Sequence, residues 1–148
     1  MNEMKNLKNM VGVMLLALSL LLIGCSLDEP DGKWDKMKWV NVDDLAKDHG
    51  VYLLYQEGET VTFECKNYRG PWISDVTIDG VHQEINYEDP RSFESEWLEV
   101  KMNGNKMTIT VASLPDSLES RYFNLIVTAG DIFHDFKFSQ RRGIHPWM

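Results

Sequence analysis

The chain has 148 residues, of which 26% are charged, and it carries a formal net charge of −8 at pH 7. An acidic protein is repelled by nucleic-acid phosphates, so this charge argues against nucleic-acid binding. The length suits one domain with a sizeable core, and the two cysteines, Cys25 and Cys65, are too few for a disulfide framework.

The N-terminus has the three parts of a secretion signal. Lys5 and Lys8 form a positive start, and an apolar run of 14 residues extends from Met10 to Ile23. This run is shorter than the roughly 20 residues that a membrane-spanning helix needs. It ends at Leu22-Ile23-Gly24-Cys25, which resembles the lipobox of bacterial lipoproteins. The resemblance implies that residues 1–24 are removed and that lipid on Cys25 anchors the protein in a membrane; an ordinary signal peptide is the alternative.

Residues 25–38 are expected to be the acylated N-terminus and a flexible tether. The stretch from Ser26 to Gly32 is acidic and contains proline and glycine, as solvated linkers do. It resembles the acidic export signal that follows the cysteine in Bacteroidota surface lipoproteins. The resemblance implies an outer-membrane protein displayed on the cell surface, with the periplasmic face as the alternative.

The remaining chain shows short alternating runs separated by turn residues, which predicts two stacked antiparallel sheets over residues 39–140. Asp79-Gly80 predicts a tight hairpin turn. A helical hint at 43–48 fits a loop equally well, and 141–148 is expected to be a tail. The eight expected strands are 51–56, 60–66, 72–78, 81–87, 96–101, 106–111, 121–128 and 132–140.

Alternation also predicts which side chains enter the core. Cys65 shares its face with two apolar neighbours, so we interpret it as a small buried residue rather than a reactive thiol. His82 and Glu84 are expected on the outer face of their strand. The expected inward positions are Val61, Phe63, Cys65, Trp72, Val76, Ile78, Val81, Ile85, Tyr87, Leu98, Val100, Met107, Ile109, Val111, Phe123, Leu125, Val127, Phe136 and Phe138.

Six short motifs occur in a recognisable order. They are Gly58 before an alternating strand, Trp72-Ile73-Ser74, Trp97-Leu98-Glu99-Val100, Met107 to Val111, a strand that opens at Arg121 and ends Val127-Thr128-Ala129-Gly130, and a last strand ending Phe138-Ser139-Gln140. Together the segment from about 51 to 140 resembles the BACON domain of Bacteroidota surface proteins. The resemblance implies an immunoglobulin-like antiparallel β-sandwich of seven to eight strands. It also implies either carbohydrate or mucin binding or a spacer role, and here only residues 141–148 follow the domain.

No pattern of an enzyme is present: there is no Gly-x-Ser-x-Gly, His-Glu-x-x-His, phosphate loop or Cys-x-x-Cys. We therefore expect no catalysis, no cofactor and no metal. The spacing of His82 and Glu84 is that of an ordinary polar sheet face, and Asp43-Asp44 does not match a calcium loop.

Aromatic residues offer a sharper functional hypothesis, because sugars stack on tryptophan and tyrosine while polar side chains bond the hydroxyls. Trp72 and Trp97 are expected in the core. Tyr68, Arg69 and Trp147, in a loop and in the tail, are the candidate ligand-binding residues. The sequence thus predicts a lipid-anchored, non-catalytic binding module for glycans or for a glycan-uptake complex. The alternative is an interaction lipoprotein that docks to an outer-membrane or surface partner through an apolar patch or an open strand edge.

Overall fold

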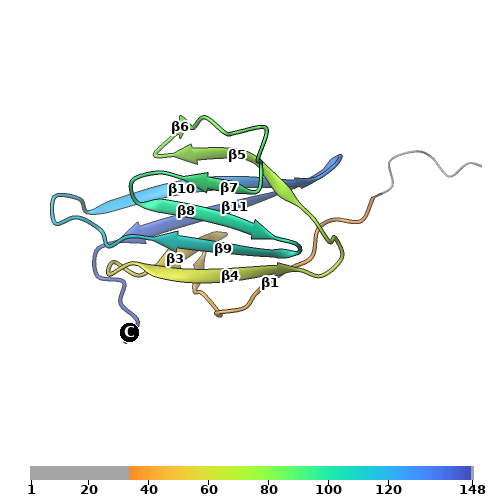
Figure 1. The fold of residues 1–148 in the computed structure, drawn as a ribbon. Coiled ribbons are helices and arrows are strands. Elements are labelled where there is room, and N and C mark those ends of the chain that lie inside the picture. Colours follow the sequence, from red (N-terminus) through yellow and green to blue (C-terminus); the bar gives the residue numbers. More distant parts are fainter. Residues whose placement is uncertain (1–33, 148) are drawn as a thin grey trace, which may run out of the picture. The chain divides into compact units, whose positions relative to one another are not determined.

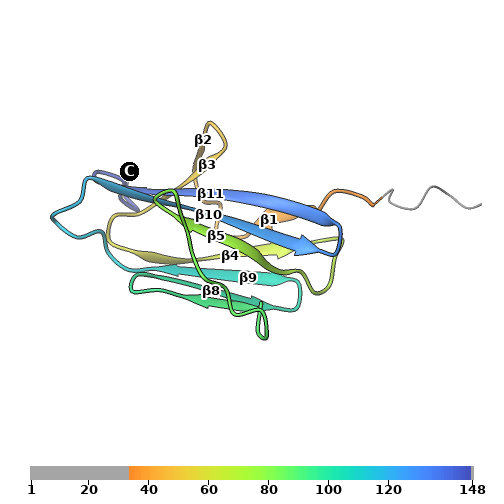
Figure 2. The same cartoon turned by 90° about the horizontal axis from the view of Figure 1, so that it is seen from above.

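The computed structural model describes residues 34–147, which form two stacked β-sheets (Figures 1 and 2). One sheet has the order β1-β4-β9-β8-β7 and the other β2-β3-β11-β10-β5-β6. Within this range no helix could cross a membrane. The strands are β1 (Trp39–Asn41), β2 (Lys47–Asp48), β3 (Val51–Leu54), β4 (Glu59–Cys65), β5 (Trp72–Ile78), β6 (Val81–His82), β7 (Ser92–Glu94), β8 (Leu98–Asn103), β9 (Lys106–Val111), β10 (Ser120–Ala129) and β11 (Ile132–Arg141).

This architecture confirms the predicted all-β, immunoglobulin-like sandwich. The hairpin of β10 and β11 forms the centre of the larger sheet, and ten residues of each strand are paired. β5 pairs antiparallel with β10, and β3 pairs parallel with β11. The signal segment and Cys25 lie outside the described residues. Three short strands that alternation did not predict (β1, β2 and β7) complete the sheet edges.

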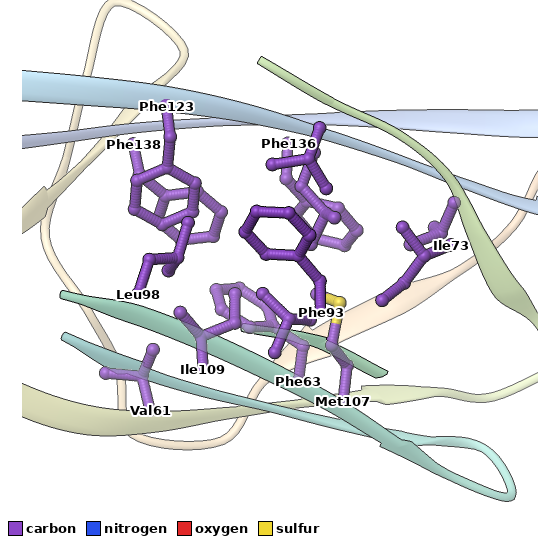
Figure 3. Packing of buried hydrophobic residues seen from close by; sticks show 14 of the residues in the cluster. Val61, Phe63, Ile73, Phe93, Leu98, Met107, Ile109, Phe123, Phe136 and Phe138 are labelled. Carbon is purple, nitrogen blue, oxygen red and sulfur yellow. The ribbon is translucent and has the colours of Figure 1, made fainter. Parts of the chain in front are cut away.

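Regular alternation builds the core between the sheets (Figure 3). Phe123 and Phe138 stack with ring centroids 4.7 Å apart, and Phe63 meets Phe136 edge-on at 5.1 Å. Burial of one such side chain contributes about 1.5–3 kcal/mol. Cys65 is buried beside them on β4, as its parity predicted.

The turn between β5 and β6 is of the predicted type. Asp79 and Gly80 both have positive φ, at 47° and 82°, which is the backbone of a type I′ hairpin. The return strand is much shorter than expected, because pairing stops at His82. From there, residues 83–91, here called the β6–β7 loop, cross from one sheet to the other. The prediction of a strand at 81–87 was therefore wrong.

The β6–β7 loop is held by backbone hydrogen bonds to both sheets. Ile73 donates its N–H to the Pro90 carbonyl at 2.7 Å, and Met102 donates to Arg91 at 2.7 Å. Ile85 is buried, whereas Tyr87, expected on the same inward face, is 83% exposed. Because residues 83–91 do not continue the strand, their spacing in the sequence does not determine which of their side chains face the core.

A β-bulge corrects a second prediction. Asp75 pairs with Ile126 and Ile73 with Val127, so Ser74 is an extra residue on β5. The bulge puts Ile73 in the core and turns Trp72 outward, where it is 37% exposed. Trp72 is consequently not the core residue that simple alternation predicted.

Two segments outside the predicted strands also differ from expectation. The helical hint at 43–48 is wrong: its end is strand β2, and the Asn41 side chain bonds both the N–H and the carbonyl of Leu45. An asparagine that satisfies backbone groups in this way competes with helix formation. The end of the expected tether also belongs to the domain, since Met37 is buried and Asn67 bonds the backbone of Lys36 and Lys38.

Candidate functional site

The sandwich has two ends with different construction (Figure 1). The end on the right of Figure 1, here called the Trp72 end, carries the β4–β5 loop, the β8–β9 turn and the β10–β11 turn, and the described chain begins there at Trp34. The opposite end, here called the Trp97 end, carries the β3–β4 turn, the β9–β10 loop and the C-terminal residues. The candidate ligand-binding residues divide between them.

Tyr68 and Arg69 lie in the β4–β5 loop, whereas Trp147 lies beside the β3–β4 turn. These two connections flank the seven residues of β4, which span roughly 20 Å. The three residues therefore do not form one binding surface.

Each of the two aromatic candidates also makes a local contact. Tyr68 is half-buried, and its hydroxyl donates to the Asp35 carbonyl, which fixes the chain as it enters the domain. Trp147 is 74% exposed and stacks on His145 at 4.6 Å, and His145 in turn contacts Glu57. Of the two, only Trp147 offers an open ring face.

Trp97, which was predicted in the core, is half-buried and packs against it, and its partner is a buried arginine. The Arg121 guanidinium lies 3.9 Å from the Trp97 ring centroid, and its Nε donates to Gln140 Oε1 at 2.7 Å. Its Nη2 donates to the carbonyls of Ala112 and Ser113. Burial lowers the pKa of Arg121. The network gives partners to Nε and Nη2 of Arg121 and to the Gln140 amide. A separate hollow of about 230 Å³ lies beside Trp97 and is lined by Glu94, Glu96 and Glu99 among others.

The Trp72 end instead presents aromatic side chains to solvent. Trp72 on β5 and Phe133 on β11 both pair with Thr128 on β10, so all three lie on one outer sheet face. Two strand spacings separate Trp72 from Phe133, or roughly 10 Å. Phe133 is 60% exposed. Between them, the Thr128 hydroxyl bonds the carbonyls of Gly130 and Ile132, which fixes the β10–β11 turn.

A hollow adjoins this aromatic face. It has a volume of about 420 Å³ and is lined by Trp72 and by Glu88, Asp89, Pro90 and Arg91 of the β6–β7 loop. A second hollow, of about 530 Å³, shares Glu88 and continues along the loop past Asn86 and Tyr87. We call Trp72, Phe133 and the β6–β7 loop the Trp72 face.

Several charged groups of the Trp72 face are available for a ligand, whereas Asn86 Oδ1 accepts the Glu88 N–H at 3.0 Å. Within residues 34–147, the side chains of Glu84, Glu88 and Arg91 form no hydrogen bond or ion pair, while Asp89 accepts from the Ser92 hydroxyl at 3.2 Å. No group of three potential metal-ligating side chains occurs in this range. Aromatic faces, carboxylates, an amide and a guanidinium can stack on and hydrogen-bond a polyhydroxylated ligand.

Sequence reasoning missed this site for identifiable reasons. The bulge at Ser74 has no signal in the local pattern, and it alone decides that Trp72 faces outward. The loop had a signal, because Glu88-Asp89-Pro90 reads as a turn, but the alternation of 81–87 suggested a longer strand before it.

Comparison with solved structures identifies a relative. A protein of Bacteroides thetaiotaomicron, solved by NMR, is 35% identical in sequence, and the match covers 79% of this chain and 96% of that protein with a TM-score of 0.65. This chain belongs to the same family as that Bacteroides protein. The shared region is the length of a whole domain, so the relationship extends over the sandwich rather than over one motif.

Titin domains are more distant. The M1 domain of titin is 10% identical, with 75% of this chain and 99% of that domain covered and a TM-score of 0.46. Titin domain M7 is 9% identical, with coverages of 73% and 96% and a TM-score of 0.39. Similarity this low says nothing about function. No protein-family model and no curated protein matches the chain.

Proposed function

We propose that this protein is a lipid-anchored, non-catalytic carbohydrate-binding module, held to the outer membrane by Cys25 and displayed at the cell surface. The observation that carries the proposal is the exposed ring of Trp72 beside a hollow lined by Glu88, Asp89 and Arg91. The ordered resemblance to BACON domains and the lipobox at Leu22–Cys25 support the same assignment.

The docking alternative gains less support from the fold. A partner that adds a strand needs a long open edge. All four edge strands are short: β1 and β7 have three residues each, and β2 and β6 have two. Short edge strands of this kind offer few backbone groups to a partner. The open side of β11 at 132–136, which β3 does not reach, is where strand addition would have to occur, and it is also short.

Binding to a panel of polysaccharides and mucin glycans tests the function and its location together. We expect saturable binding that weakens at least tenfold, or about 1.4 kcal/mol, in Trp72→Ala and in Phe133→Ala. The matched control is Trp147→Ala, which removes a still more exposed aromatic from the opposite end. If only Trp147→Ala abolishes binding, the function stands and the Trp72 face is wrong; absence of binding across the panel favours docking.

The anchor is tested separately. Incorporation of labelled palmitate and recovery in the outer-membrane fraction are expected for the natural chain and lost in Cys25→Ala. Protease accessibility on intact cells then distinguishes surface display from the periplasmic face. If Cys25→Ala carries no label and is still recovered in the membrane fraction as fully as the natural chain, lipid on Cys25 is not the anchor.

A further inference from the structure

The charge around the Trp72 face restricts which glycans it can hold. Acidic side chains surround both parts of it: Glu84, Glu88 and Asp89 in the loop, and Asp131 and Asp135 beside Phe133. All five are exposed. The aromatic rings, rather than these acids, define where a ligand would lie, and the acids define what charge it can carry.

Fewer basic than acidic side chains line the two hollows of the Trp72 face, and Arg69 of the β4–β5 loop lies at the same end of the sandwich. Arg91 lines the hollow, and Lys137 on β11 lies 4.0 Å from Asp135. His82, on the neighbouring β6, has its Nδ1 3.2 Å from Asp75. Among the residues that line the two hollows, Arg91 is therefore the one basic side chain, against the carboxylates of Glu84, Glu88 and Asp89.

The whole chain adds to this local field. Once residues 1–24 are removed, the chain has 22 acidic and 13 basic residues, a formal charge of −9. A sulfated or sialylated chain approaching the Trp72 face would meet like charge at short range and from the protein as a whole. A neutral sugar meets no such repulsion, and carboxylates are good acceptors for its hydroxyl groups.

We infer that the Trp72 face binds neutral glycans and rejects anionic ones. This inference rests on the proposed carbohydrate-binding function and narrows its substrate class. Within mucin, it selects stretches that lack sialic acid and sulfate.

The test compares each neutral polysaccharide of a panel (glucan, xylan, mannan and galactan) with its own sulfated derivative. Mucin glycans are included before and after removal of sialic acid and sulfate. The mature lipidated protein in detergent is titrated at low salt, where the Debye length is longest, and again at about 1 M salt, where it falls to about 3 Å. We expect the anionic member of each pair to bind at least tenfold more weakly at low salt and the difference to narrow at high salt.

Two double variants separate local charge from total charge. Glu84→Gln/Glu88→Gln removes two charges at the Trp72 face. It should reduce the ratio of the affinity for the neutral glycan to the affinity for its anionic partner at least threefold. Glu94→Gln/Glu96→Gln removes two exposed carboxylates elsewhere and should change the ratio less. Equal or stronger binding of the anionic members overturns the inference and leaves the proposed function intact. Absence of binding to every member overturns the proposed function, and the inference with it.

Discussion

The two ends of the sandwich use tryptophan in opposite ways. At the Trp97 end, the Arg121 guanidinium covers the ring at 3.9 Å from its centroid, and its Nε and Nη2 donate to Gln140 and to backbone carbonyls. At the Trp72 end, one bulged residue turns the ring outward next to a loop in which, within the described residues, Glu84, Glu88 and Arg91 form no hydrogen bond or ion pair. The comparison shows that the two ends differ in how far internal contacts occupy their aromatic and polar groups.

At the Trp97 end, one hydrogen-bond network also joins the ends of several strands. Gln140 on β11 donates to the carbonyls of Tyr55 and Ala112, while it accepts from Arg121 on β10. A cation is thus buried without a carboxylate partner and is satisfied by amide and carbonyl oxygens. Because a buried polar group without partners is costly, removing one member should affect all the others.

The largest expected effect is therefore the loss of Arg121. Arg121→Ala leaves Gln140 Oε1 and the Ser113 carbonyl without their donor, removes one of the two donors to the Ala112 carbonyl, and uncovers the Trp97 ring. We expect a loss of about 4 kcal/mol in the free energy of unfolding, measured by urea denaturation. Trp72→Ala is the matched control and should cost less than about 1 kcal/mol, because that ring is already partly in solvent. Comparable losses in both variants would remove the distinction between the two ends.

Alternation predicted most of the fold because most strands are regular. Residues 106–111 were predicted to the residue as β9, and β4, β10 and β11 differ from their predicted ranges by one or two residues. In these strands each inward position meets the core, so the sequence period is also the structural period. The fold class follows from them alone.

Neither the site nor the network could be predicted in the same way. Arg121 bonds residues 8, 9 and 19 positions away, and Gln140 bonds Tyr55 at a separation of 85. Such pairs depend on how strand ends meet, which a local pattern does not contain. Trp72 was assigned to the core because a bulge leaves no trace in the spacing of apolar residues, and Tyr68 looked like a free loop aromatic although it clamps Asp35.

A pair of glycines gives the next largest effect. Gly58, at the Trp97 end, has φ of +85°, and a Cβ there would lie 2.6 Å from the Val111 carbonyl oxygen. Gly130, at the Trp72 end, has φ of +78° with no atom within 4 Å of that position. We expect Gly58→Ala to cost about 3 kcal/mol, from both backbone and steric strain, and Gly130→Ala about 1–2 kcal/mol from backbone strain alone.

Thermal unfolding of the two glycine variants measures this difference directly. Equal shifts in Tm would mean that the backbone around Val111 moves aside to accept the methyl group. The Trp97 end would then be less tightly packed than its hydrogen bonds indicate.

The smallest effect concerns pH and arises at the Trp72 end. His134 on β11 lies on the inward side, 4.5 Å from Phe136 and 6.3 Å from Trp39 between ring centroids. Burial lowers the pKa of His134, nearby Lys47 lowers it further, and Asp135 opposes them. Because the folded pKa lies below the unfolded value of about 6.5, protonation favours the unfolded chain.

The contribution of neutral His134 to the free energy of unfolding is therefore complete above about pH 6.5. It is lost as the pH falls from there through the folded-state pKa. Urea midpoints measured at pH 7.5 and pH 5 should differ less in His134→Leu than in the natural protein. His82→Leu, which replaces an exposed histidine on β6, should leave the difference in place. If His134→Leu keeps the full difference, the imidazole is hydrated in solution, and the opening of the Trp72 end extends inward to the aromatic residues beneath it.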